Sequence, residues 1–189
     1  KKKIIYGNLI EKLRYGENPH QESAIYSKSD SLNIKQLNGK QLSYNNYNDI
    51  FSALTISKSL PNNTGTVIVK HANPSGVSID KNSLKSYELA LACDPVSAFG
   101  GVVSCNFKIN KTLALKLNNI FLEVVIANGF EDNALKILKK KKNLRIIDAA
   151  KFIIKDTLKF TSADETIITQ LDDLKKFNVK NFKVVSKKK

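Results

Sequence analysis

Short apolar runs that alternate with amphipathic segments constrain the fold of this chain most. Four such runs have the length and composition of buried strands, at residues 66–69, 100–107, 123–127 and 144–148. Four segments have the character of helices, at residues 46–60, 83–93, 111–120 and 131–140. Strands that alternate with helices predict the α/β class, with a layered α-β-α fold and a mostly parallel sheet.

The two ends of the chain are less regular than its middle. Residues 8–47 hold turn-like clusters of Gly, Asn, Pro and Tyr, and residues 149–189 hold weak strand signals without a clear helix. We therefore predict one domain, 1–189, with an irregular tail from 149 to 189. The chain begins at Lys1 and contains no Met, so we expect it to be a piece of a longer protein.

Lysine dominates the charge of the chain. The formal net charge is +14, and three lysine runs supply much of it, at 1–3, 139–142 and 187–189. Arg14 and Arg145 are the only arginines, although base reading and bidentate phosphate contacts favour arginine. The composition therefore argues against a sequence-specific nucleic-acid partner. It leaves open the attraction of anionic small molecules and loose binding of polyanions.

The sequence gives no sign of export or of a membrane partner. No apolar run approaches the length of a membrane span, and the first residues lack the apolar core of a signal peptide. Cys93 and Cys105 lie in apolar sequence and form no C-x-x-C pair. We interpret them as free, buried thiols and predict a cytoplasmic protein.

Lys70 and His71 stand side by side where an apolar strand is predicted to end, in the stretch TVIVKHANPSGV. Histidine can accept a proton near neutral pH, and lysine can stabilise developing negative charge. Adjacent strand residues point to opposite faces, so both reach one ligand only if the chain turns there. We take Asn73-Pro74 and Gly76 as the turn signal. The alternative, which this stretch leaves open, is a histidine bound to a backbone carbonyl beside a surface lysine.

Three further clusters flank the predicted strands. RYGENPHQ contains Arg14 and Tyr15, and the FGG at 99–101 could let backbone N–H groups approach a ligand closely. Glu123 stands at the entry of the third strand. Ligand sites in open α/β sheets form beyond the carboxyl ends of strands, so we expect these clusters near that edge. Each one alone is equally consistent with a polar loop or a tight strand entry.

Several common catalytic motifs are absent from the sequence. It contains no G-x-x-x-x-G-K-[ST] loop, no G-x-G-x-x-G and no G-x-S-x-G. A zinc deaminase needs H-x-E followed by P-C-x-x-C, and the chain has no such cysteine pair. We therefore predict no metal site, and a deaminase of related fold would require bound zinc.

Five segments, taken together and in this order, resemble one family. They are LRYGENPHQ (13–21), LNGKQLSYNN (37–46), VIVKHANPSGV (68–77), DPVSAFGG (94–101) and FLEVVIA (121–127). The sequence resembles the transformylase domain of the bifunctional AICAR transformylase/IMP cyclohydrolase family. The resemblance runs from 13 to 147, and more faintly to 188. It implies a cytidine-deaminase-like fold without zinc, of which this chain would be the first deaminase-like half.

The resemblance also implies a reaction and a set of site residues. The family transfers the formyl group of 10-formyltetrahydrofolate to the amine of AICAR, an aminoimidazole carboxamide ribonucleotide. His71 matches the proton acceptor, and Lys70 matches the residue that stabilises charge on the transferring formyl group. Nucleotide-binding positions are matched by Arg14, Tyr15, Gly100 and Glu123, and a pocket-lining position by Phe99.

Other parts of the family's protein are missing from this sequence. In the family a cyclohydrolase domain precedes this region, a second deaminase-like half follows it, and the sites form at a homodimer interface. We therefore expect partial binding of AICAR, loss of most contacts to the reduced folate, and no activity of this chain alone. The competing hypothesis is a non-catalytic, lysine-rich module that binds polyanions or nucleic acid. Salt separates the two, because lysine-driven binding weakens steeply with ionic strength.

Overall fold

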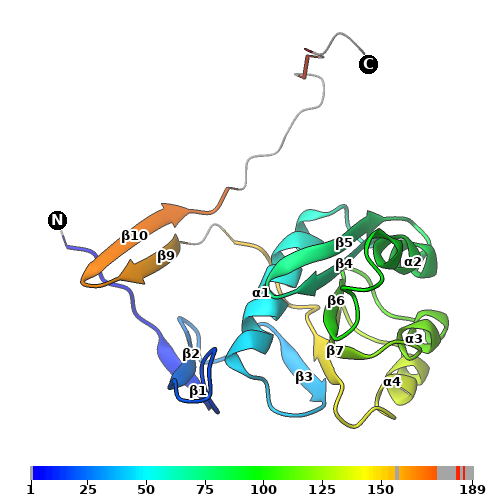
Figure 1. Cartoon of the computed structure of the whole chain (residues 1–189), viewed down its shortest axis with the longest axis horizontal. Helices are drawn as coiled ribbons and strands as arrows, with labels where there is room; N and C mark the ends of the chain where they lie inside the picture. Colours follow the sequence, from blue (N-terminus) through cyan, green and yellow to red (C-terminus); the bar gives the residue numbers. More distant parts are fainter. Residues whose placement is uncertain (1, 156–157, 174–181, 184, 186–189) are drawn as a thin grey trace. The chain divides into compact units, whose positions relative to one another are not determined.

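The computed structural model describes residues 2–155, 158–173, 182, 183 and 185. The chain divides into two compact units, Lys1–Ile153 and Ile154–Lys189, which are described separately. The first unit contains strands β1 to β8 and helices α1 to α4 (Figure 1). The lysine run at 187–189 and Lys1 lie outside the described residues.

A mixed six-stranded sheet forms the centre of the first unit, in the order β3-β8-β7-β6-β4-β5. Its strands are β3 (Lys35–Asn38), β4 (Gly65–Lys70), β5 (Asn73–Ile79), β6 (Gly101–Cys105), β7 (Leu122–Ala127) and β8 (Arg145–Asp148). β6, β7 and β8 run parallel, whereas the pairs β3–β8, β4–β5 and β4–β6 are antiparallel. The expected mostly parallel sheet is therefore wrong, although the α/β class is confirmed.

An unpredicted edge strand accounts for part of this difference. Asn73, Pro74 and Gly76, which we took as a turn signal, belong to β5. Only two residues join β4 to β5, and so short a connection forces an antiparallel pair. Proline is tolerated because β5 is an edge strand. Gly76 serves packing rather than turning, since a Cβ there would lie 2.0 Å from the carbonyl oxygen of Ala90 in α2.

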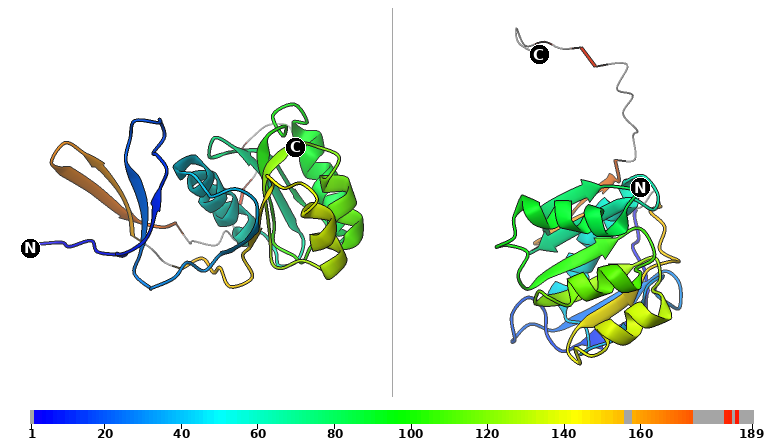
Figure 2. Two further views of the ribbon diagram at one scale, coloured as in Figure 1. Left: turned by 90° about the horizontal axis from the view of Figure 1, so that it is seen from below. Right: turned by 90° about the vertical axis from the view of Figure 1, so that its right-hand side faces the viewer.

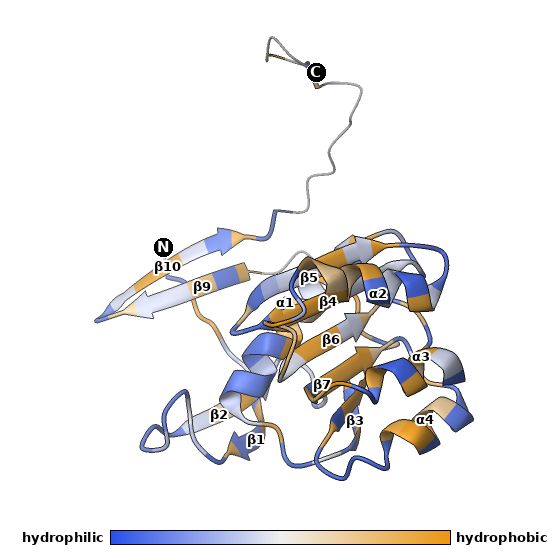
Figure 3. Cartoon of the chain, turned by 45° about the vertical axis from the view of Figure 1, so that its right-hand side comes forward, coloured by the Kyte–Doolittle hydropathy of each residue, from blue (hydrophilic) through white to orange (hydrophobic). Residues whose placement is uncertain are grey.

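Helices cover both faces of the sheet (Figure 2). α1 (Tyr44–Ser59) packs on one face, and α2 (Ser83–Cys93), α3 (Lys111–Leu117) and α4 (Asp132–Leu138) pack on the other. Strand side chains alternate between two buried clusters, so Val67 and Val69 face α1 while Ile68 faces the other helices. Figure 3 shows the resulting pattern, with apolar strands between helices whose exposed faces are hydrophilic.

The start of α1 is fixed by local hydrogen bonds. Ser43 and Asn46 form a capping box, in which each side chain accepts the backbone N–H of the other, at 3.2 and 3.1 Å. Asn82, and not Ser83 at the first helical position, caps α2. These caps set where each helix begins relative to the sheet.

Two antiparallel hairpins lie outside the central sheet. β1 (Asn8–Leu13) pairs with β2 (Ser23–Ser27) in the first unit. In the second unit, β9 (Leu158–Ala163) pairs with β10 (Thr166–Leu171), so the expected irregular tail contains a regular hairpin. The side chains of β10 are exposed along its whole length.

Two further sequence predictions concern cysteines and membranes. Both cysteines are free, but Cys93 is exposed at the end of α2, so the prediction of two buried thiols is wrong for that residue. Cys105 is buried in β6. Within the part of the chain that the structure describes, no helix has both the length and the apolar character that a membrane span requires.

Candidate functional site

The candidate site lies along the edge of the sheet that runs across the strand ends, where β4 ends and where β6, β7 and β8 begin. Lys70 is the last residue of β4, Gly100 precedes β6, Glu123 is second in β7, and Arg145 is first in β8. These positions share one edge because β4 runs antiparallel to β6, and β6 parallel to β7 and β8. The cluster of Lys70 and His71 lies at the carboxyl end of its strand, as expected, whereas Gly100 and Glu123 lie at the amino ends of β6 and β7.

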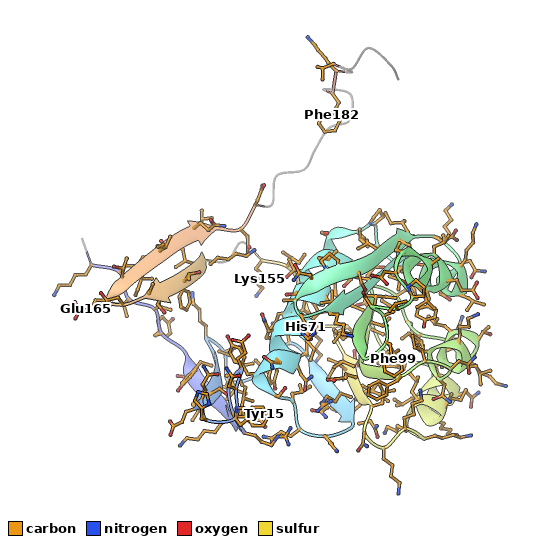
Figure 4. The ribbon with its side chains drawn as sticks, viewed as in Figure 1. Tyr15, His71, Phe99, Lys155, Glu165 and Phe182 are labelled. Atoms are coloured by element: carbon orange, nitrogen blue, oxygen red, sulfur yellow. The ribbon has the colours of Figure 1, made fainter. Side chains whose placement is uncertain are left out.

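His71 and Ala72 form the two-residue turn between β4 and β5, flanked by the paired residues Lys70 and Asn73. Both have positive φ, 52° for His71 and 59° for Ala72, in a region that non-glycine residues seldom occupy. The chain does turn directly after Lys70, as predicted, but through 71–72. His71, labelled in Figure 4, is exposed in this turn. The turn breaks the strand alternation that would otherwise send Lys70 and His71 to opposite faces.

Lys70 reaches across to the segment that precedes β6. Its Nζ donates to the carbonyl oxygen of Phe99 at 3.0 Å, which uses one of the three N–H donors of the ammonium. The Phe99 ring packs against the Phe121 ring, with centroids 5.3 Å apart. Both rings are more than half exposed, at 59% and 53%. The edge therefore combines a cation with an accessible aromatic surface.

The glycines before β6 do not present free N–H groups. Gly100 has φ +71° and donates its N–H to the carbonyl oxygen of Phe121 at 2.9 Å. Gly101 donates to the carbonyl oxygen of Ala98 at 3.0 Å. The interpretation that these N–H groups approach a ligand is therefore wrong. Gly100 instead ties the start of β6 to the start of β7 through a conformation that favours glycine.

Glu123 joins three other parts of the chain at this edge. Its Oε2 accepts a hydrogen bond from Asn46 Nδ2 at 3.1 Å and lies 3.8 Å from Nη1 of Arg145. Burial lowers the pKa of the Arg145 guanidinium. Glu123 and Tyr15 raise this pKa, and Arg14 lowers it. The two arginines of the chain thus lie close enough to repel each other. The Nε atom of Arg145 is buried and has no hydrogen-bond partner among the residues that the structure describes.

An open cavity of about 440 Å³ adjoins this group. Basic side chains predominate in its lining, which comprises Lys40, Phe121, Leu122, Glu123, Lys141, Lys142, Asn143, Leu144 and Arg145. Four cations and one carboxylate make this cavity suited to an anionic ligand. A second open cavity, of about 620 Å³, lies along the β1–β2 hairpin and is lined in part by Arg14 and His20.

Sequence reasoning missed three polar residues of this edge: Asn46, Asp49 and Arg145. Asp49 Oδ1 accepts the backbone N–H of Ala72 at 2.6 Å, which links α1 to the His71 turn. Asn46 and Asp49 are three residues apart and so share one face of α1. This spacing of two polar residues beside an apolar helix face could have indicated that both contribute to the site. The prediction for 46–60 used only the apolar positions.

Contacts and electrostatic interactions connect the seven predicted site residues in two groups, because Glu123 joins His71 to Arg14 and Tyr15 through Asp49 and Arg145. Lys70 contacts Phe99 and thereby the segment of Gly100. Asp49 interacts electrostatically with both His71 and Glu123. Arg145 connects Glu123 to Arg14 and Tyr15. Among the residues described, no group of three or more His, Cys, Asp or Glu side chains is arranged to hold a metal ion.

A model of the AICARFT/IMPCHase bienzyme family matches residues 2–189. The chain belongs to this family. Three curated relatives are each called bifunctional purine biosynthesis protein PurH. The Clostridioides difficile protein is 47% identical over 145 residues, which cover 74% of this chain and 28% of the relative. The Acetivibrio thermocellus protein is 41% identical over 189 residues, and the Oceanobacillus iheyensis protein 39% over 185, each covering 95% of this chain and 36% of the relative.

The chain therefore spans about a third of the length of these AICARFT/IMPCHase relatives. Its family membership confirms the resemblance read from the five segments. The roles of individual residues stay predictions, and so do the cytidine-deaminase-like likeness and the assignment of this chain to the first half of a transformylase domain.

Proposed function

We propose that this chain takes part in purine biosynthesis as part of the nucleotide site of an AICAR transformylase. In this proposal the formyl group of 10-formyltetrahydrofolate passes to the amine of AICAR. The supporting observation is that the adjacent residues Lys70 and His71 and the distant Glu123 lie at one sheet edge in a member of the AICARFT/IMPCHase family.

The chemistry of this reaction needs a base and a cation. The AICAR amine attacks the formyl carbon, a new C–N bond forms, and the carbonyl electrons move to oxygen. His71 takes the proton that the amine loses, and the Lys70 ammonium stabilises the oxyanion. When the tetrahedral intermediate collapses, the bond from the formyl carbon to folate N10 breaks and its electron pair stays on that nitrogen, which takes up a proton. The products are formyl-AICAR and tetrahydrofolate.

Other residues of the site suit a nucleotide. Arg14 lowers the pKa of Arg145, which is the mark of repulsion between like charges, and a phosphate bound near both would relieve that repulsion. The exposed Phe99 ring offers a surface against which a planar heterocycle can pack. Glu123 can accept hydrogen bonds from the amine or carboxamide. We expect the contacts to the folate, and the homodimer that completes the site, to involve parts of the bifunctional protein beyond this segment.

Calorimetric titration of the chain with AICAR, and with AMP as the comparison, tests the nucleotide site. Each titration is done at two salt concentrations. We expect AICAR to bind more tightly than AMP with a shallow salt dependence, because a built site recognises the carboxamide and amine as well as the phosphate. Equal binding of both nucleotides that weakens steeply with salt would instead support the lysine-rich polyanion-binding module.

Two variants sharpen this titration. Arg14→Ala should weaken AICAR binding by roughly tenfold, the usual loss for one charge-assisted phosphate contact. The matched control is Lys108→Ala with Lys111→Ala, which removes two exposed positive charges beyond the carboxyl end of β6, whereas the candidate site lies at the amino end of that strand. If the double variant weakens binding as much as Arg14→Ala does, general charge rather than the site drives the interaction.

A further inference from the structure

The turn that presents His71 has an unfavourable backbone conformation for its sequence. Two-residue hairpin turns with positive φ at both positions strongly prefer Asn-Gly or Asp-Gly. Here the two positions are His71 and Ala72, neither of which is glycine. Residues held in sparsely populated φ/ψ regions persist only where surrounding contacts determine them. The structure should therefore contain a contact that holds this turn.

Asp49 supplies such a contact from a different element. It lies in α1, 23 residues before Ala72, and its Oδ1 accepts the Ala72 N–H at 2.6 Å. A backbone N–H that donates to a carboxylate forms one of the stronger hydrogen bonds in proteins. A second, local bond runs from Asn73 Nδ2 to the carbonyl oxygen of His71 at 2.8 Å. The peptide group between His71 and Ala72 is thus held from both sides, its carbonyl oxygen by Asn73 of β5 and its N–H by Asp49 of α1.

We propose that Asp49 is a positioning residue, which holds the His71-Ala72 turn in its left-handed conformation and places a negative charge beside the imidazole. The geometric part of this role is independent of the reaction. The catalytic part rests on the proposed function, in which His71 accepts a proton from the amine. A carboxylate beside the imidazole stabilises the imidazolium that this step creates.

The charged groups around Asp49 support this assignment. His71 faces it from the β4–β5 turn, and Glu123 faces it from β7. Burial raises the pKa of Asp49 above its ordinary value. The Ala72 N–H and His71 lower this pKa, and Glu123 raises it. The pKa of Asp49 is therefore raised while its carboxylate is bonded to the turn, and its ionisation can be followed through the Ala72 amide, which donates to it.

Amide NMR on the chain tests the geometric part. The Ala72 amide proton should shift with pH as Asp49 titrates, and Asp49→Asn should abolish that dependence while keeping an oxygen acceptor. Asp49→Ala should accelerate hydrogen exchange of the Ala72 amide by roughly tenfold, and Asp49→Asn should largely restore the protection. An Ala72 amide that neither follows pH nor exchanges faster in Asp49→Ala would overturn the proposal.

Asp80 provides a matched control. Its Oδ1 accepts the backbone N–H of Asn82 at 2.8 Å, the same kind of bond in a loop before α2. The bond to Asn82 has the largest effect on the pKa of Asp80 and lowers it, burial raises this pKa, and Lys85 lowers it further. Asp80→Ala should therefore change the Asn82 amide and leave the Ala72 amide as it is. A change at Ala72 in this variant would mean that the exchange reports general loosening, which contradicts the proposal.

Kinetics in a complete bifunctional protein that carries this segment test the catalytic part. Asp49→Ala should lower kcat for formyl transfer by roughly 10- to 100-fold, change the KM for AICAR little, and shift the acid limb of the pH–rate profile. Asp80→Ala should leave both constants unchanged. A large rise in KM with normal kcat would show that Asp49 binds the nucleotide and would overturn the positioning role. If the NMR results hold but wild type transfers no formyl group, the proposed function fails and the geometric role stands.

Discussion

Gly76 offers a direct test of how α2 packs on the edge strand β5. An alanine Cβ at this position would lie 2.0 Å from the carbonyl oxygen of Ala90 and 2.9 Å from its carbonyl carbon. Unstrained C···O contacts are about 3.3 Å or longer, so Gly76→Ala requires β5 and α2 to separate by roughly 1 Å. Both obstacles are backbone atoms of a helix, which cannot rotate away as a flexible side chain could.

The expected cost follows from these distances. Overpacking of this kind costs about 1–3 kcal/mol, and the loss of unfolded-state freedom on replacing glycine returns about 0.4–1 kcal/mol. We therefore expect the free energy of unfolding to fall by about 1.3 kcal/mol. At about 2–4 °C per kcal/mol for a chain of this size, Tm should fall by roughly 3–5 °C. Urea unfolding followed by circular dichroism measures the first quantity, and scanning calorimetry the second.

Gly129→Ala is the comparison variant for this experiment. Gly129 has φ +96°, but the nearest atom to an added Cβ there is 3.9 Å away. Gly129→Ala should destabilise the fold because alanine disfavours a positive φ. Gly76→Ala should destabilise it through a steric clash, since Gly76 has no positive φ. The reasoning is refuted if Gly76→Ala is as stable as wild type, since a rigid contact at 2.0 Å cannot be absorbed without a measurable penalty.

Three other predictions follow from the site and the core. His71→Ala, assayed in a complete bifunctional protein that carries this segment, should cut kcat by roughly 10²- to 10⁴-fold with little change in AICAR affinity, and near-normal turnover would refute its role as base. Burial raises the pKa of Cys105 to about 12, so Ellman's reagent at pH 8 should titrate the exposed Cys93 alone in the native chain and both thiols in denaturant. Burial raises the pKa of Tyr87 from 10.0 to about 12, so the hydroxyl loses its proton at lower pH in the unfolded state than in the folded state. The free energy of unfolding should therefore fall as the pH rises from 10 to 12, and this fall should be smaller in Tyr87→Phe than in wild type.

The sequence predicted local elements better than their pairing. The helices at 46–60 and 83–93 and the strands at 66–69 and 123–127 match observed elements closely, because their apolar spacing depends on neighbouring residues alone. Strand direction depends on partners far away in the chain, so the antiparallel pairs of β4 were not accessible to the same reasoning.

The turn at 71–72 shows why part of the site escaped prediction. His-Ala has no intrinsic preference for a hairpin turn, whereas Asn73-Pro74 and Gly76 do signal turns. In the structure Gly76 is required by the backbone of α2, and Ala72 is held by Asp49. Tertiary contacts therefore place the turn at 71–72, although the local sequence favours a turn at 73–76. Lys70 and His71 were found because a possible base and a cation stand together where an apolar strand ends, whereas Glu123 was assigned a role only through the family resemblance.

The pairing of β3 with β8 bears on how this chain folds. Asn38 Nδ2 in β3 donates to the carbonyl oxygen of Leu144, just before β8, and these residues are 106 positions apart. The entropy of closing such a loop must be overcome before the contact stabilises anything, and sheets rich in distant pairings fold slowly. β3 pairs with β8 and with no other strand of the central sheet, so it reaches the rest of the sheet only through β8. Arg145, the first residue of β8, pairs with Val124 beside Glu123 of β7, so we expect a probe of the Glu123–Arg145 contact to report when β8 joins β7 during folding.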